Sequence, residues 1–444
     1  MTTTTIHGDL PPAAQRAVKK ATARLLPFLA LMLILAFLDR ANIGFAKTVY
    51  QADTGISDAA YAFGAGIFFI GYALFEVPSN LVLHRVGARL WLSRIMITWG
   101  LVSAAMMFAH TPTSLYILRF LLGVCEAGFY PGVLLYLTYW FPAKQRARAT
   151  GLFYLGVPLS LVIGSPLSGW LLTHHDMFGL SNWQWMFVIE GLAATVVGIV
   201  ALFYLIDKPR DAKWLDDEER LALTTVLEEE ERGKLREVKH SALGVLKDPR
   251  VLAFIGIYFF LQIGTAPLTF YLPSRLAAAI GGNVDLGIGL LLAIPWICSA
   301  IATRVFTVYA DNHDNHRTVA IWMVTAGSLA LASIAWWANP WMIVLAACIA
   351  VPGLTASQPV FWSLPTRYLG GTGAASGIAF IVSIGNLGAF TSPQAKAYAE
   401  KVTESANTGF LVVALMCFAA VLLLLWLRPP SPAASITIGA AHRT

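Results

Sequence analysis

Long apolar runs recur along almost the whole chain. Twelve of them reach about 20 residues, the length that an α-helix needs to cross the hydrocarbon core of a bilayer. They lie roughly at residues 25–46, 59–83, 91–109, 113–140, 149–173, 183–206, 251–272, 284–308, 318–338, 340–363, 373–398 and 408–428. Because lipid leaves backbone polar groups no partner outside the chain, these runs predict an all-α membrane protein with twelve transmembrane helices.

Composition agrees with a location in lipid. The 444 residues are 57% hydrophobic and only 13% charged, whereas soluble proteins have about 25% charged residues. No small-residue cleavage signature separates the first run from the second, so the first is expected to stay as a helix and not to be removed as a signal peptide. The four cysteines lie inside predicted spans without C-x-x-C spacing, which favours packing and predicts no metal site.

Basic residues are distributed unevenly among the short loops. The loops after the even-numbered runs hold most of them: Arg85, Arg89, Arg94, Lys144, Arg146, Arg148, Arg317 and Arg367. Under the positive-inside rule, this pattern predicts that both termini lie in the cytoplasm. The net charge of +6 is then accounted for by topology, and we expect no nucleic-acid partner.

A single long hydrophilic segment divides the runs into two groups of six. It contains "DDEER" and "EEEERGKLREVKH", a mixed-charge composition that favours a solvated surface helix, with a regulatory or partner-binding role as the alternative. The predicted organisation is a cytoplasmic N-terminal segment at 1–24, a six-helix bundle at 25–206, a charged cytoplasmic connector at 207–250, a second six-helix bundle at 251–428 and a cytoplasmic tail at 429–444.

The two halves share a weak sequence similarity. The fourth run ends in "YWFPAKQRARATGLF" and the tenth in "FWSLPTRYLGGTGAASGIAF", each with Trp, Pro and Arg before a small-residue start of the next run. The next runs then reach Ser165-Pro166 and Ser392-Pro393. Such repeats are typical of secondary transporters, whose substrate site lies between the halves near the midplane.

Ionisable residues inside a span cost about 2.5–3.5 kcal/mol, so they usually face a cavity or a partner. Asp39 and Arg40 are adjacent in the first run, and adjacent helical residues point about 100° apart, so one should face the central cavity and the other the surrounding helices. An arginine fork suits a carboxylate, and a nearby aspartate can bind a proton. The alternative is that each forms a buried ion pair that only fixes packing.

Further candidates lie in the second and fourth runs. Arg119 and Glu126 are seven residues apart and share a helix face, so they can couple a proton to substrate or simply hold two helices together. Tyr72 can donate a hydrogen bond to a substrate or belong to the core. For Glu76 the sequence favours a structural role, and for Glu190 and Arg304, toward the ends of their runs, structural or gating pairs.

Several blocks together resemble a known family. They are "FLDRANIGFAK", "GYALFEVPSNLVLHRVGARLW", "LRFLLGVCEAGFYPGVLLYLTYWFP", "GSPLSGWLL" and "FWSLPTRYLGGTGAASGIAFIVSIGNLGAF". The chain resembles the anion:cation symporter family of the major facilitator superfamily, especially its bacterial branch for tartrate, phthalate, hydroxyphenylacetate, nicotinate and aldarates. The resemblance implies two pseudo-symmetric six-helix bundles in the bacterial inner membrane and uptake of a small organic carboxylate coupled to H⁺ or, in some branches, Na⁺, with no other cofactor.

The resemblance also implies roles for individual residues. Arg40 would bind the substrate carboxylate, and two further residues would line the substrate site: Tyr72 and Asn386. Proton coupling would depend on Asp39 and Glu126, with Arg119 as the switching partner of these acids. The resemblance therefore implies that Asp39 and Arg40 act together, with the aspartate binding the coupling cation and the arginine binding the substrate anion.

Two loops match the gate motifs of the superfamily with one departure. "NLVLHRVGAR" has His84 where an acid is usual but keeps Arg89, and "VYADNHDNHR" keeps Asp311 and Arg317. The resemblance implies gating roles for Arg89, Asp311 and Arg317. In the fifth run, apolar residues around Val157 replace a glutamine of sugar-acid carriers, which argues against a heavily hydroxylated substrate.

Other functions use the same fold. A proton-driven exporter or antiporter of organic anions would need the same charged residues and would differ in transport direction, and a substrate sensor would bind without counterflow. The chain has no H-E-x-x-H, G-x-S-x-G or P-loop motif, so we do not expect an enzyme. We expect a monomer in the lipid bilayer whose substrate is a mono- or dicarboxylate, aromatic or a short hydroxy acid.

Overall fold

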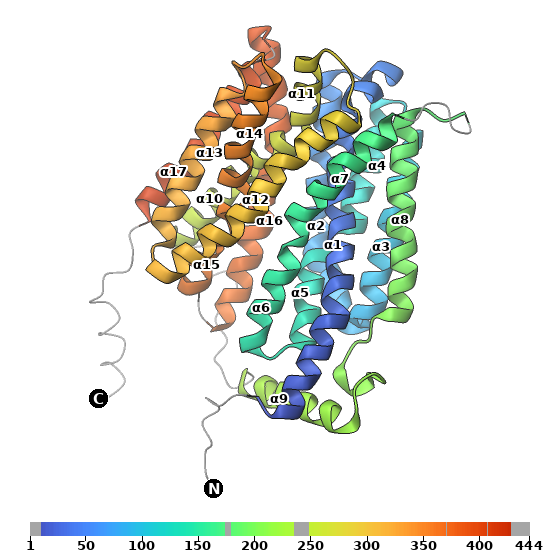
Figure 1. Cartoon of the computed structure of the whole chain (residues 1–444), viewed down its shortest axis with the longest axis vertical. Coiled ribbons are helices and arrows are strands. Elements are labelled where there is room, and N and C mark those ends of the chain that lie inside the picture. The colour runs from blue at the N-terminus through green and yellow to red at the C-terminus, as the bar shows by residue number, and fades with distance from the viewer. Residues whose placement is uncertain (1–9, 174–178, 235–247, 370, 406, 428–444) are drawn as a thin grey trace.

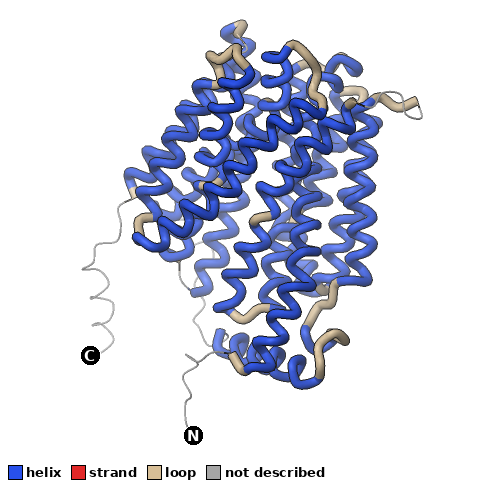
Figure 2. The backbone as a smooth tube through the Cα atoms, viewed as in Figure 1, coloured by secondary structure: helices blue, strands red, loops and turns tan. Residues whose placement is uncertain are grey.

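The structure is a computed structural model that describes residues 10–173, 179–234, 248–369, 371–405 and 407–427. Within these residues the regular elements are helices (Figure 2). Ten helical segments are long and apolar enough to cross a membrane, and α13 and α16 bring the number to the predicted twelve. The predicted tail at 429–444 lies outside the described residues.

Six spans form the first half, which lies on one side of the molecule (Figure 1). Its helices are α1 (Pro12–Thr54), α2 (Asp58–Val86), α3 (Ala88–Ala105), α4 (Pro112–Glu126), α5 (Phe129–Trp140), α6 (Ala143–Tyr154), α7 (Gly156–Leu172) and α8 (Asn182–Tyr204). The fourth predicted run is two helices, because the chain turns at Gly128, which has a positive φ of 86°. A Cβ there would also lie 2.4 Å from the Ser79 hydroxyl, so only glycine fits.

The other six spans form the second half, on the opposite side in Figure 1. Its helices are α10 (Pro249–Phe270), α11 (Leu272–Ile280), α12 (Leu286–His313), α13 (His316–Ser333), α14 (Pro340–Thr355), α15 (Ser357–Tyr368), α16 (Gly371–Thr403) and α17 (Thr408–Trp426). The tenth predicted run is divided between α14 and α15, as the fourth is between α4 and α5. The fourth span of each half is therefore broken near its middle.

The connector contains the expected helix, α9 (Asp217–Lys234). It packs on the start of α1, where Arg16 pairs with Glu218 at 2.9 Å and Lys20 with Glu219 at 2.7 Å. Glu230 accepts a hydrogen bond of 3.0 Å from the Ala143 backbone nitrogen at the start of α6. These contacts explain why α1 begins before its apolar run, and they attach the connector to the first half.

Matching arginines close each half at the end near α9. Arg89, at the start of α3, donates through Nε to the Leu202 carbonyl in the last turn of α8 at 2.6 Å. Arg317, at the start of α13, donates through Nε to the Leu424 carbonyl in the last turn of α17 at 2.7 Å. A cation at a helix C-terminus satisfies free carbonyls and complements the helix dipole. Each contact joins two helices of the same half, and neither links the two halves. A gating role for these arginines therefore stays a prediction.

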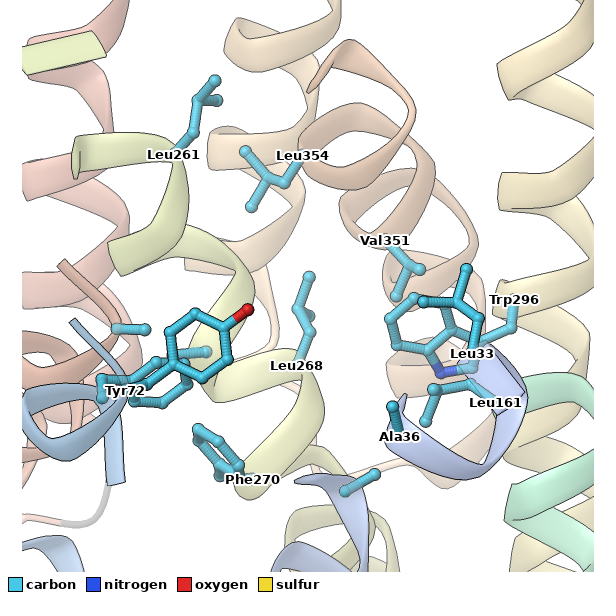
Figure 3. Packing of buried hydrophobic residues seen from close by; sticks show 14 of the residues in the cluster. Leu33, Ala36, Tyr72, Leu161, Leu261, Leu268, Phe270, Trp296, Val351 and Leu354 are labelled. Atoms are coloured by element: carbon cyan, nitrogen blue, oxygen red, sulfur yellow. The ribbon is translucent and has the colours of Figure 1, made fainter. Parts of the chain in front are cut away.

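The halves meet where α7 packs on α12 and where α2 packs on α16. Gly289 lies near the start of α12, at the end of the molecule away from α9 (Figure 1). A Cβ at Gly289 would lie 2.3 Å from the Ser165 carbonyl oxygen of α7. Nearer the centre, apolar side chains of both halves meet, among them Leu33, Leu161 and Trp296 (Figure 3).

Substitution of Gly289 tests this contact. Gly289→Ala should force α7 and α12 apart and lower stability by about 1–3 kcal/mol, the usual cost of overpacking. Gly282→Ala is the matched control, because a Cβ at Gly282 meets no atom within 4 Å. Thermal unfolding of the two purified variants in detergent gives the comparison. Equal unfolding midpoints would contradict the close approach of the helices.

Candidate functional site

A buried ion pair joins α1 to α4 in the first half. The Arg40 Nε donates to Glu126 Oε1 at 2.7 Å, and its Nη2 lies 2.5 Å from the same oxygen. Glu126 is fully buried, whereas the Arg40 side chain keeps 19% of its surface exposed. The carboxylate is therefore enclosed by protein, while part of the Arg40 side chain stays exposed.

Three aromatic rings surround the Arg40 guanidinium. Its central carbon lies 5.0 Å from the ring centre of Phe37, 5.5 Å from that of Phe68 and 5.0 Å from that of Tyr72. Ring faces at these distances attract a cation. Together with Glu126, the rings hold the positive charge in a fixed position near the middle of α1.

Asp39 faces a different set of neighbours. Its Oδ1 accepts hydrogen bonds from the Ser103 hydroxyl on α3 and from the Asn42 amide, the latter at 3.2 Å. Its Oδ2 and the Asn42 Oδ1 are buried without a hydrogen-bond partner among the described residues. Asp39 and Arg40 therefore point toward different helices, as adjacent helical residues must.

Arg119 is fully buried and has weaker partners than Arg40. Its only described hydrogen bonds reach the carbonyls of Gly64 and Ala65, both at 3.4 Å, and its Nη1 has no partner within the described part of the chain. Its central carbon lies 5.1 Å from the ring centre of Phe68, the ring that Arg40 also approaches. Glu126 thus pairs with Arg40 in this conformation and not with Arg119, although Arg119 and Glu126 lie on the same helix.

The second half contributes neutral amides. Asn386 on α16 accepts a hydrogen bond of 3.1 Å from Gln262 on α10, and Gln262 accepts one of 3.1 Å from Gln358 on α15. These three side chains are half-buried. Sequence reasoning identified Asn386 alone, although a glutamine inside an apolar run is itself a detectable signal.

The predicted gate residues lie at helix ends on the side of the molecule near α9. Asp311 accepts a hydrogen bond from His316 Nε2 at 2.8 Å. Nearby, Arg367 donates a hydrogen bond to Asp314, and this bond together with the arginine charge holds the pKa of Asp314 below its usual range. Since all of these residues belong to the second half, their contacts leave the gating role of Asp311 a prediction.

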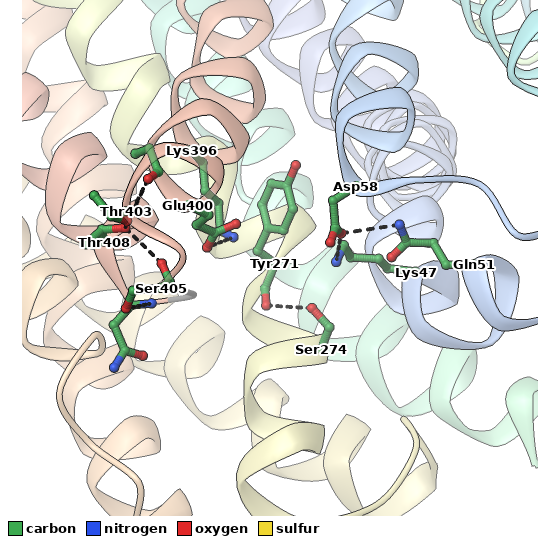
Figure 4. A network of polar contacts seen from close by, with 12 residues as sticks. Lys47, Gln51, Asp58, Tyr271, Ser274, Lys396, Glu400, Thr403, Ser405 and Thr408 are labelled. Atoms are coloured by element: carbon green, nitrogen blue, oxygen red, sulfur yellow. Dashed lines mark hydrogen bonds and ion pairs between the residues drawn. The ribbon is translucent and has the colours of Figure 1, made fainter.

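Charged and aromatic side chains of both halves form a layer at the interface (Figure 4), near the end of α1 that is remote from its contact with α9. Lys47 of the first half pairs with Asp58 at 2.8 Å, and Lys396 of the second half pairs with Glu400 at 2.6 Å. The Tyr271 ring centre lies 5.6 Å from Lys47 Nζ and 4.2 Å from Lys396 Nζ. Two residues of the polar stretch "SPQAKAYAEK" at the end of the eleventh run, Lys396 and Glu400, belong to this layer.

The sequence profile of the Major Facilitator Superfamily matches residues 29–393. The chain belongs to the major facilitator superfamily. It is 43% identical over 421 residues to a putative tartrate transporter of Agrobacterium vitis, with 94% of this chain and 93% of the relative covered. It is 41% identical over 411 residues to the inner membrane transport protein RhmT of Escherichia coli, with 93% and 95% covered.

A solved structure shares the fold at low sequence identity. It is a bacterial homologue of the human lysosomal transporter Spinster in an inward-facing, unoccupied conformation, with a TM-score of 0.73, 16% identity and coverage of 93% of this chain and 100% of the other. The superfamily and the relatives are those of transporters and not of enzymes. They confirm the resemblance seen in the sequence, and this chain is a multi-pass inner-membrane transporter of a small molecule.

The two arginines should respond differently to replacement by methionine. Arg40→Met leaves the Glu126 carboxylate buried without its cation, which should cost about 3–5 kcal/mol of stability. Arg119→Met removes a buried guanidinium with poor partners, so its cost should be below about 1 kcal/mol or reversed in sign. Thermal unfolding in detergent compares the variants, and a larger loss for Arg119→Met would contradict the observed pairing.

Proposed function

We propose that this transporter imports a small organic carboxylate together with protons by alternating access, with Arg40 as the binding site of the carboxylate. The observation that carries the proposal is the pairing of a partly exposed Arg40 with a fully enclosed Glu126. A substrate carboxylate can compete with Glu126 for the same guanidinium, because both are planar anions that suit the arginine fork. Tyr72, under the guanidinium, and Asn386, in the facing half, complete the proposed binding site.

The balance of charge around Arg40 would couple the binding of the substrate anion to the binding of a proton. Arg40 and Glu126 together are neutral, and a bound carboxylate would add a negative charge to a region that lipid and protein surround. A proton on Glu126 restores neutrality and also releases Glu126 from Arg40. Anion and proton therefore favour each other's binding, as linked equilibria require.

Asp39 and Arg119 would complete the proton path. Glu126 is the last residue of α4, directly before the turn at Gly128, so its backbone lies next to a break where small movements are possible. Arg119, with its poorly bonded guanidinium, is the second cation toward which Glu126 can turn. Asp39 has a free buried oxygen that a proton would satisfy. We infer H⁺ as the coupling ion, with Na⁺ as the alternative.

We also propose that α9 and both termini lie in the cytoplasm. The basic residues Arg89, Arg146 and Arg317 lie at the end of the molecule near α9, in agreement with the positive-inside rule. The layer of Lys47, Tyr271 and Lys396 would then close the periplasmic side.

The first experiment is proton uptake into proteoliposomes, reported by internal pyranine. Tartrate, nicotinate, phthalate, hydroxyphenylacetate and galactonate are added one at a time without sodium. A proton signal with one of them supports symport. A signal only after addition of sodium would replace H⁺ with Na⁺ as the coupling ion, and silence under both conditions would favour export or sensing.

Arg40→Lys tests the binding role. Lysine keeps the charge but lacks the planar fork, so the carboxylate-dependent proton signal should fall roughly tenfold or more, the effect of losing a charge-assisted bidentate contact. Arg304→Lys is the control, because Arg304 is exposed on α12 and should tolerate the same change. An unaltered signal with Arg40→Lys would exclude Arg40 as the carboxylate site.

Glu126→Gln tests the coupling role. In the native protein the affinity for the carboxylate should rise as the pH falls, because a proton removes Glu126 as a competitor for Arg40. The glutamine variant has no such competitor, so its affinity should be nearly independent of pH and substrate exchange should continue without net proton uptake. Counterflow and pyranine assays across a pH series measure both effects. A pH dependence that persists in the variant would transfer the coupling role to another group.

A further inference from the structure

Glu76 shares a helix face with Tyr72. The two residues are one turn apart on α2, which places their Cβ atoms about 5–6 Å from each other. Both are buried, at 6% and 4% exposure, whereas the neighbouring Phe75 and Val77 are 42% and 51% exposed. Glu76 therefore points into the protein on the face whose tyrosine lies under Arg40.

Glu76 also reaches the other half of the transporter. Its Oε2 accepts a hydrogen bond of 3.1 Å from the Ser383 hydroxyl on α16. Ser383 is three residues from Asn386, so the two lie on one face of α16, and Asn386 is bonded to Gln262. Glu76, a carboxylate of the first half, is thus bonded to the face of α16 that carries neutral polar groups of the second half.

Arg40 and Glu76 have complementary chemistry. A guanidinium can only donate hydrogen bonds, and an ionised carboxylate can only accept them. Glu76 Oε2 already accepts one hydroxyl hydrogen bond, from Ser383, and a carboxyl oxygen can accept such a bond in either protonation state. Tyr72 lies between the donor fork and the acceptor, because its ring centre is 5.0 Å from the Arg40 guanidinium carbon and it shares a helix face with Glu76. A molecule that satisfies both needs a carboxylate and, a few bonds away, an O–H donor.

We propose that Glu76 is a specificity-determining residue that accepts a hydrogen bond from a hydroxyl group of the substrate. The substrate hydroxyl takes the place of the Ser383 hydroxyl while the carboxylate binds Arg40, so the site selects hydroxy carboxylates over plain carboxylates. This inference rests on the proposed function. A single acceptor, with the apolar residues around Val157 on α7 in place of a further polar group, fits a substrate with one or two hydroxyls.

A graded series of compounds provides the test. Tartrate, malate and succinate have the same four-carbon chain and two carboxylates, with two, one and no hydroxyls. Mandelate and phenylacetate form a second pair that differs by one hydroxyl. In proteoliposomes, the half-saturating concentration for proton uptake should be roughly tenfold or more lower for the hydroxylated members, the ratio that one hydrogen bond to a charged group provides.

Two variants separate this role from a structural one. Glu76→Met removes the acceptor at similar side-chain length and should make hydroxylated and plain acids equivalent. Ser383→Ala breaks the same hydrogen bond between the halves but leaves the acceptor, so the preference for hydroxy acids should remain or increase. Should Glu76→Met fail to fold, Glu76→Gln replaces it, and loss of the charge should reduce the preference to an intermediate ratio.

Each outcome decides between these roles. Equal half-saturating concentrations for malate and succinate in the native protein would overturn the inference while leaving carboxylate import intact. An equal loss of preference in the Glu76 and Ser383 variants would show that the contact only holds the halves together. Silence with all five acids, with and without sodium, would overturn the proposed function and this inference with it.

Discussion

A charge inside a bilayer must find its counter-charge within the protein, and the arrangement of the first half follows from this requirement. Arg40 on α1 is neutralised by Glu126 at the end of α4, and α2 supplies two of the rings that face the guanidinium. Three helices are thereby fixed around one charge. Because the pair is neutral only as long as it is complete, an anion bound to Arg40 would change the charge of its surroundings, and in the proposed mechanism a proton would compensate for that change.

Each half is held together by polar contacts of its own. Within each half, Arg89 or Arg317 joins the start of one helix to the last turn of another, and α9 is bonded to the first half at Arg16 and Lys20. Among the described residues, fewer polar contacts join one half to the other than join helices within a half. They are the layer of Tyr271 with Lys47 and Lys396 at one end, and the hydrogen bond between Ser383 and Glu76 farther along α2. An interface of this kind can open at one end without disturbing either half.

The sequence predicted the number and position of the spans because each apolar run is a local feature, and it predicted that Asp39 and Arg40 diverge because helix geometry is fixed. It did not reveal that Glu126 pairs with Arg40, since 86 residues separate them and nothing local distinguishes that pairing from a role with Arg119. Glycines and a proline near Gly128 indicate that the fourth run can bend, but they do not show that it divides into two helices there. Gln262 and Gln358 were missed because neutral amides in a span carry a weaker signal than charges.

The two halves divide the chemistry of recognition. Among the described residues, the charged groups around Arg40 belong to the first half, whereas the second half presents Gln262, Gln358, Asn386 and Ser383. Charged groups fix which class of molecule binds, because an unmatched charge in a buried site is costly. Within that class, we infer that members are distinguished at Glu76, the carboxylate that meets the neutral groups of the second half through Ser383. A substitution at this contact between the halves would then change the preferred substrate while the Arg40–Glu126 ion pair remains in place.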